Sequence, residues 1–114
     1  MTLKISTAIA VLGLAWAVPA AAQDAKQIEH GKTVYAAQKC SICHSIEGKG
    51  QVKGPLDGVG SKLSTDEIRE WIVNPAEMTK KTKAERKPPM RAYPKLAKED
   101  LDGLVAYMAS LKKK

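Results

Sequence analysis

The sequence predicts one small all-α domain of three or more helices. Apolar residues recur at helical spacing in three stretches, and no stretch alternates in the manner of a convincing β-strand. The chain has 114 residues, which is enough for one domain. It has no Phe and only 4% aromatic residues, so large core side chains are scarce. A domain of this size and composition is expected to complete its core with a metal, a disulfide or a cofactor.

The first 22 residues are predicted to be a cleaved signal peptide, which leaves residues 23–114 as the domain. Lys4 precedes an uncharged, mostly apolar run over residues 5–18, and a proline and three alanines then precede Gln23. This order is typical of a secretory signal, and the run is shorter than the roughly 20 residues of a membrane span. We therefore expect a periplasmic protein without stable membrane insertion. An uncleaved N-terminal anchor stays open as the alternative.

The first helix of the domain is predicted from residue 24 to residue 38. Its apolar face carries Ile28, Gly31, Val34 and Tyr35. A glycine in the middle of a helix costs about 1 kcal/mol relative to alanine. Gly31 therefore indicates that another backbone or ring approaches this face very closely.

Residues 40–62 are predicted to form a loop, because glycines and a proline interrupt any long regular structure. A second helix is expected to begin at Ser64. Ser64 and Glu67 have the spacing of a capping box, in which each side chain satisfies a free backbone N–H. The helix should end at Asn74, because the residue before a proline is disfavoured in the α conformation.

Residues 77–94 are predicted to form a long polar loop that contains several prolines, and residues 98–112 the last helix. Acidic residues at the start of this helix and lysines at its end suit the helix dipole. One apolar stripe runs along it, made by Leu101, Leu104, Val105, Met108 and Leu111.

Residues 40–44, Cys-Ser-Ile-Cys-His, carry the chemistry and include the chain's only two cysteines. C-x-x-C-H is the attachment pattern for c-type haem. Two thiols one helical turn apart add across the two vinyl groups of haem, and the next residue donates a ring nitrogen to the iron. We therefore predict one covalently bound haem c, attached through Cys40 and Cys43, with His44 as an iron ligand.

Three other interpretations of this motif are possible. A disulfide between Cys40 and Cys43 would suit an oxidising compartment. A redox-active C-x-x-C expects a βαβ setting, which the pattern does not predict. A zinc site could combine both cysteines with His44 and His30, but the spacing is irregular and there is no second cysteine pair. The signal peptide, the helical pattern and the scarcity of core residues all favour haem.

The mature chain resembles the class I cytochromes c along essentially its whole length. The resemblance implies the cytochrome c fold, with helices wrapped around one haem, and the function of an electron carrier. The matching segments follow the family's order: Gly31-Lys32 with Tyr35, the haem motif, Gly54-Pro55-Leu56, Trp71-Ile72-Val73-Asn74-Pro75, Pro89-Met90, and Leu104-Val105-Ala106-Tyr107-Met108.

The resemblance also implies roles for individual residues. The carbonyl of Pro55 is expected to accept the second N–H of His44, which would fix the ring and raise its basicity. Trp71 and Ile72 are expected to pack on the haem. Gly31 is expected to let the first and last helices cross closely.

The iron needs a second axial ligand, for which Met90, Met78, Met108 and His30 are the candidates. Met108 lies on the apolar stripe, so core packing explains it better. Met90 lies in a proline-stiffened segment before the last helix, where the resembling family places its methionine ligand. The resemblance therefore points to Met90. Met78 stays open, because residues 75–90 look longer and more charged than is common in the family.

With His44 and Met90 both bound, no coordination site would be open to a substrate, so we expect a one-electron carrier and not an enzyme. The net charge of +7 falls to +6 when Lys4 is removed with the signal peptide. An exported protein meets no nucleic acid in normal work, so this charge points to acidic redox proteins that dock at the haem edge. The protein is expected to be a monomer.

Two other functions remain possible at this stage. A haem-c enzyme or gas-binding protein would have an open sixth site, and would require that Met90 be absent from the iron. The chain could also be the electron-transfer subunit of a larger oxidoreductase.

Overall fold

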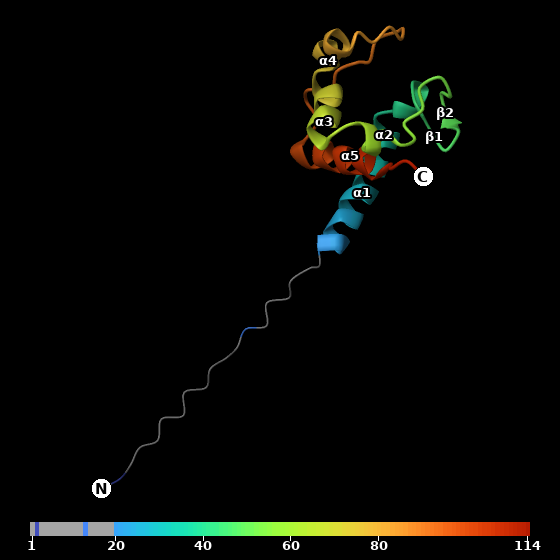
Figure 1. Ribbon diagram of the computed structural model, residues 1–114. Coiled ribbons are helices and arrows are strands. Elements are labelled where there is room, and N and C mark those ends of the chain that lie inside the picture. The colour runs from blue at the N-terminus through green and yellow to red at the C-terminus, as the bar shows by residue number, and fades with distance from the viewer. Residues whose placement is uncertain (1, 3–12, 14–19) are drawn as a thin grey trace.

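The computed structural model describes residues 2, 13 and 20–114, and this part of the chain is mainly helical (Figure 1). The predicted all-α fold class is therefore confirmed. The elements in chain order are α1 (Ala20–Ala37), the 3-10 helix η1 (Cys40–Ile42), β1 (Ser45–Ile46), β2 (Lys49–Gly50), α2 (Val59–Lys62), α3 (Thr65–Val73), α4 (Pro75–Thr82) and α5 (Lys98–Ser110).

Most of the predicted signal peptide, residues 1–22, lies outside the described residues, so its cleavage stays a prediction. In the described part of the chain, no helix is long and apolar enough to cross a membrane. The helix predicted from residue 24 begins earlier in the structure, at Ala20.

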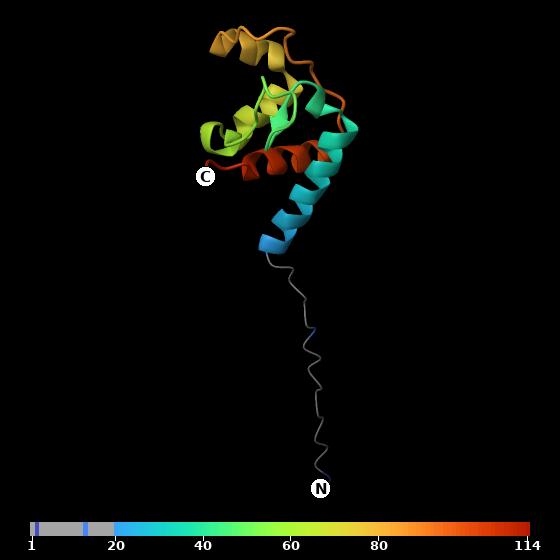
Figure 2. The ribbon, with the colours of Figure 1, turned by 90° about the vertical axis from the view of Figure 1, so that its right-hand side faces the viewer.

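Helices α1 and α5 cross (Figure 2), and theirs is the most extensive contact between helices in the described part of the chain. A Cβ added at Gly31 would collide with the carbonyl oxygen of Gly103 and lie 2.6 Å from the Cβ of Tyr107. The predicted close approach at Gly31 is therefore confirmed. Beside the crossing, the rings of Tyr35 and Tyr107 meet edge to face, with centroids 5.8 Å apart.

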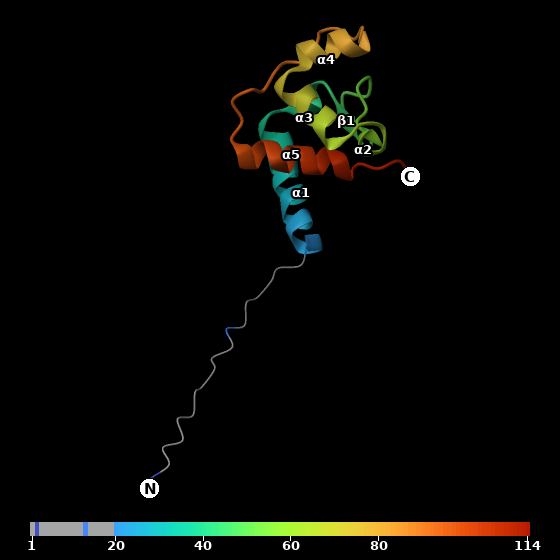
Figure 3. The same ribbon diagram turned by 60° about the vertical axis from the view of Figure 1, so that its left-hand side comes forward.

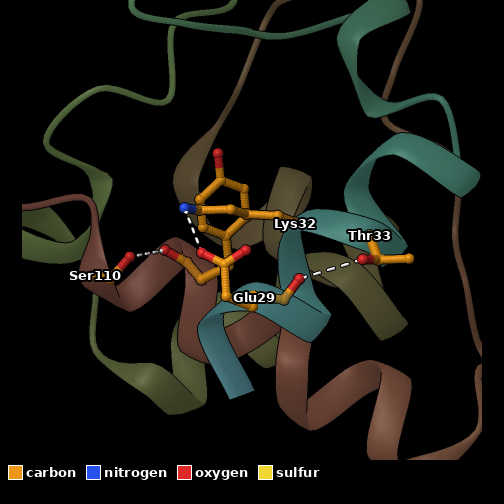
Figure 4. Close-up of polar contacts among 5 residues, drawn as sticks. Glu29, Lys32, Thr33 and Ser110 are labelled. Atoms are coloured by element: carbon orange, nitrogen blue, oxygen red, sulfur yellow. Dashed lines mark hydrogen bonds and ion pairs between the residues drawn. The ribbon is translucent and has the colours of Figure 1, made fainter. Parts of the chain in front are cut away.

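Polar contacts cover the outer side of this crossing (Figure 4). The Lys32 ammonium donates a hydrogen bond to Glu29 over 2.9 Å and lies 6.0 Å from the centre of the Tyr107 ring. Ser110 donates to the carbonyl oxygen of Tyr107 over 2.6 Å. These contacts are exposed, so we ascribe the crossing mainly to its buried backbone contact.

The hydrophobic core lies where α1, α3 and α5 meet. The buried cluster consists of Val34, Ile68, Ile72, Leu104, Val105 and Met108. The apolar stripe predicted for the last helix supplies three of these residues, and α3 supplies Ile68 and Ile72, as expected for amphipathic helices. The core is small for a domain of this length.

The predicted start of the second helix is confirmed at α3. The Ser64 hydroxyl accepts from the Glu67 N–H over 3.2 Å, and the Glu67 carboxylate accepts from the Ser64 N–H over 3.0 Å. These two bonds complete the capping box. The helix ends at Val73, next to Asn74, as predicted.

The long loop predicted over residues 77–94 is wrong in its first part, because α4 occupies residues 75–82. Pro75 fits the first turn of this helix, where its missing N–H is not needed. Pro75 and Met78 are the buried residues of this helix, and two apolar positions among polar and charged residues are too few to predict a helix from the sequence. Lys83 ends the helix in the left-handed conformation, so the loop covers residues 83–97.

The segment predicted as a loop over residues 40–62 contains short elements. β1 and β2 form an antiparallel pair of two residues each, so the prediction without strands is wrong on this small scale. Gly48 and Gly50 have φ angles of 77° and 107°, which permit the tight turn and its exit. The one-turn helix α2 lies against α5, where the Gly60 N–H donates to the Leu111 carbonyl over 2.9 Å.

Candidate functional site

A cavity of about 730 Å³ lies between α3, the residue 40–44 turn and the loop over residues 83–97. Apolar side chains make up much of its wall, among them Leu56, Val59, Leu63, Ile68, Leu104 and Met108. The structure also brings to this wall six residues that the sequence predicted for the site, Cys40, Cys43, His44, Trp71, Ile72 and Met90. One apolar chamber therefore collects predicted residues from three separate parts of the chain.

The two cysteines lie on one tight turn after α1. Lys39 takes the left-handed conformation, which ends α1 and starts η1. The carbonyl of Cys40 then accepts from the N–H of Cys43 over 3.1 Å and from the N–H of His44 over 2.9 Å. Both thiols are free and line the cavity. Burial raises the pKa of the Cys40 thiol. The turn thus presents two thiols and one imidazole to the same chamber.

The His44 ring is half-buried, and its Nδ1 donates a hydrogen bond to a backbone carbonyl over 3.0 Å. A carbonyl oxygen can only accept, so the proton of the neutral ring is on Nδ1, and Nε2 keeps a lone pair for a metal. Burial is the main cause that lowers the pKa of His44, and the nearby positive charge of Arg86 lowers it further. The neutral ring is the form that binds iron.

The acceptor of this hydrogen bond is Gly54, so the prediction of the Pro55 carbonyl is wrong by one residue. The Gly54 carbonyl also accepts from the Ser45 N–H over 3.1 Å, while the Leu56 N–H donates to Ser45 over 2.8 Å. These two bonds hold residues 54–56 in a parallel bridge with Ser45. The bridge directs the Gly54 carbonyl toward His44. Pro55 lies in the same segment but does not line the cavity.

The four candidates for the second axial ligand differ in position. Met90 lines the cavity from the loop, while Met78 is a buried residue of α4 that does not line the cavity. Met108 lines the cavity from the core, where it is 6% exposed. His30 pairs instead with Asp100, 2.7 Å away. The positions favour Met90 over Met78 and His30, and the ligand assignment stays a prediction.

Trp71 and Ile72 lie side by side in the chain and both line the cavity from α3. Ile72 is 5% exposed and belongs to the core cluster, whereas Trp71 is half-buried at the chamber wall. Their positions suit the predicted packing on a haem.

Other residues of the chamber carried no signal of this role in the sequence. The buried hydroxyl of Tyr35, which lines the cavity, has no hydrogen-bond partner among the described residues, and burial raises its pKa to about 12. Arg86 reaches the carbonyl of Cys43 over 2.6 Å, although the two are 43 positions apart. The sequence places Tyr35 on a helix face and in a segment that matches the family, but neither indicates a buried hydroxyl at the cavity. The contact of Arg86 joins residues so far apart in the chain that no local pattern could predict it.

The chemical groups that border the cavity are those that a covalently attached haem requires. Two free thiols, a neutral imidazole with Nε2 available and a methionine thioether border a mainly apolar chamber. Thiols and imidazole are also zinc ligands. Within residues 20–114, however, no three His, Cys, Asp or Glu side chains are grouped closely enough to hold a metal ion. The zinc site with His30 is therefore not supported.

The comparisons with known proteins agree with this chemistry. The model of the family described as cytochrome c matches residues 28–112. The chain is also similar to cytochrome c oxidase subunit 2 of Alkalihalophilus pseudofirmus, with 28% identity over 91 residues. That match covers 72% of this chain and 25% of the relative, so the chain spans about a quarter of that protein's length. No solved structure was found to match.

Proposed function

Because the chain belongs to the cytochrome c family, we propose that this haem c electron-transfer protein is a free periplasmic carrier that moves one electron at a time between redox proteins. The single observation that supports the proposal best is the apolar cavity that unites Cys40, Cys43, His44 and Met90. When bound, haem c supplies an iron that changes between its ferrous and ferric forms.

The chain's own residues hold, orient and enclose this group. Cys40 and Cys43 attach it, and the Gly54 carbonyl orients the His44 ring and raises its basicity. The apolar wall excludes water, which sets the dielectric around the iron and so affects the reduction potential. We propose His44 and Met90 as the axial ligands, and this choice leaves no coordination site for a substrate. Cytochromes c are typically electron carriers, in agreement with this proposal.

The ligand assignment is tested by replacing each methionine separately. Met90→Ala should lose the methionine-ligated spectrum, lower the reduction potential and bind carbon monoxide or cyanide, because the sixth position opens. Met78→Ala is the matched control, since Met78 is buried outside the cavity wall and its loss should leave the spectrum unchanged. Loss of the spectrum in Met78→Ala alone would transfer the ligand role to Met78. Ready carbon monoxide binding by the wild type would favour the gas-binding alternative.

We further propose that an acidic redox protein docks beside the cavity. The basic collar is defined as Lys80, Lys81, Lys83, Arg86, Lys87 and Arg91, with Glu85 as the single acid between residues 80 and 91. Most of these side chains are exposed, and Arg86 and Arg91 line the cavity itself. A positive field at this place would steer an acidic partner to the haem and would weaken as salt screens it.

Charge reversal tests the basic collar. Lys81→Glu combined with Lys87→Glu should slow electron transfer to the physiological partner at low ionic strength, while spectrum and reduction potential stay nearly unchanged. Lys26→Glu combined with Lys114→Glu is the matched control, because these lysines are exposed and lie outside the basic collar. Stopped-flow rates at several ionic strengths give the comparison. If the rate does not depend on ionic strength and is unchanged by the charge reversal, the collar only keeps the protein soluble and does not steer a partner.

The similarity to an oxidase subunit supports a second candidate function, that of a bound electron-transfer subunit. The two candidates differ in the size of the native protein. Haem staining of a native gel of periplasmic extract should show a band at the size of the free chain for a carrier. A band only at the size of a larger complex would favour the subunit.

A further inference from the structure

The loop over residues 83–97 carries Met90 and runs from α4 to α5 (Figure 3). Two hydrogen bonds attach it to distant parts of the chain. Arg86 Nη2 donates to the carbonyl of Cys43 over 2.6 Å, and the Tyr93 N–H donates to the carbonyl of Ile72 over 2.8 Å. Within the described part of the chain, these are the two hydrogen bonds that link residues 85–97 to elements far away in sequence. Met90 lies between the two attachment points, four residues after the first and three before the second.

Arg86 reaches the segment that holds the proposed proximal ligand. Its guanidinium lies against Gly54, where an added Cβ would collide with Nη1 and come within 2.8 Å of Cζ. The carbonyl of that same Gly54 accepts the Nδ1 proton of His44 over 3.0 Å. Arg86 therefore contacts both the attachment turn, at Cys43, and the residue that orients His44.

We propose that Arg86 is a positioning residue that fastens the Met90 loop to the attachment turn and so keeps the two axial ligands in register. The proposal rests on Met90 as the distal ligand. A planar guanidinium can lie flat on a glycine and donate to a carbonyl at the same time, whereas the ammonium of a lysine offers only a point charge. Gly54 leaves the space that this arrangement needs.

Residues 83–92 are exposed except for Met90, whereas Tyr93 and Leu96 pack against the core. Little buried apolar surface therefore opposes opening of the part of the loop that carries Met90. A charge-assisted hydrogen bond at one end of this exposed segment therefore contributes a large share of the free energy that keeps the segment closed. Opening of the loop would withdraw the thioether of Met90 from the iron. The rate at which an added ligand enters therefore measures the contribution of Arg86.

The experiment uses the ferric holoprotein and measures the rate of cyanide binding, the methionine-ligated spectrum and the reduction potential. Arg86→Gln should speed cyanide binding about tenfold, the amount expected for loss of one hydrogen bond from a charged group. Arg86→Lys should also bind cyanide faster than the wild type, because it keeps the charge and loses the planar donor. Lys87→Gln is the matched control, since it removes the same charge one residue later and should bind cyanide at nearly the wild-type rate.

Equal cyanide rates in Arg86→Gln, Lys87→Gln and the wild type would overturn the proposal. A wild-type rate in Arg86→Lys would also overturn it, because charge alone would then explain the effect. The Met90→Ala spectrum decides the ligand assignment separately. If that assignment stands and the Arg86 rates do not change, only the positioning role fails. If Met90→Ala keeps the methionine-ligated spectrum, both proposals fail.

Discussion

Helices α1 and α5 and the loop over residues 83–97 all supply residues to the wall of the haem cavity, but the helix crossing and the loop are held in opposite ways. At the crossing, the backbones of Gly31 and Gly103 touch, and Leu104 and Val105, which follow Gly103, are buried in the core. The loop is mostly exposed and relies on the contacts of Arg86 and Tyr93. The crossing is held by close packing of many atoms. The loop is held by a few hydrogen bonds and by contact with the haem that it covers.

Because of this difference, the crossing mainly determines the stability of the fold, and the loop mainly determines iron ligation and docking. A region held by buried contacts opens only when much of the fold opens, whereas an exposed segment with few bonds can open locally. Changes at the crossing should therefore reduce the free energy of unfolding. Changes in the loop should instead alter iron ligation and docking while the remaining fold persists.

Removal of the haem attachment should have the largest effect of all. The double variant Cys40→Ala, Cys43→Ala should carry no covalent haem and should be largely unfolded, the crossing included. The core cluster is too small to fold the chain without the bound group, whose binding energy becomes folding energy. Haem staining of a denaturing gel and far-ultraviolet circular dichroism measure the two effects. A helical variant with a cooperative unfolding transition would show that the crossing is stable by itself.

Gly31→Ala should have the next largest effect, a loss of about 3 kcal/mol or more in the free energy of unfolding. The added methyl group would collide with the backbone of Gly103, which has no side chain that could move aside. Denaturant unfolding of the haem-loaded protein gives the value. Gly48→Ala is the control, because an added Cβ there would meet nothing within 4 Å and only its φ of 77° opposes the change. Equal losses at the two glycines would contradict the importance of the close approach.

Local patterns in the sequence were sufficient to predict a close approach at Gly31, the cap of α3 and the attachment motif, whereas the last helix as the partner of Gly31 was implied by the resemblance to the cytochromes c. Gly31 within a helix, the Ser64 and Glu67 spacing and the C-x-x-C-H motif each depend on residues within one or two turns. The predictions that failed depend on contacts over longer distances. α4 forms where Met78 is buried, and the acceptor for His44 is set by a backbone ladder at Ser45 and not by residue type. The Arg86 contact spans 43 positions and had no local signal.

Met108→Ala tests a residue that belongs to both the core and the cavity wall. We expect a loss of about 2–5 kcal/mol in the free energy of unfolding, because a buried side chain at 6% exposure is truncated. The methionine-ligated spectrum should persist. The paired measurement is denaturant unfolding together with the ferric spectrum. Loss of the spectrum without loss of stability would assign Met108 to the iron and contradict the separation of the two regions.

The capping box of α3 should give the smallest effect, one that depends on pH and leaves ligation unchanged. Hydrogen bonds from Ser64 hold the pKa of Glu67 below its ordinary value. Glu67 therefore adds stability above the ordinary glutamate pKa, and this contribution disappears as the pH falls through the lowered pKa of the folded state. Glu67→Gln should be less stable than the wild type at pH 7, and the gap should close on acidification.

Ser64→Ala should cost about 1 kcal/mol at pH 7, because it removes the acceptor for the Glu67 N–H. Glu77→Gln is the control, since Glu77 also lies in the first turn of a helix, but that helix has no side-chain cap. Unfolding by denaturant at pH 7 and at acidic pH compares the three variants with the wild type. Because α3 supplies the Ile72 carbonyl that holds Tyr93, a change in cyanide binding with the cap variants would show that the stable region controls the loop. We expect no such change, because the cap lies at the opposite end of α3 from Ile72.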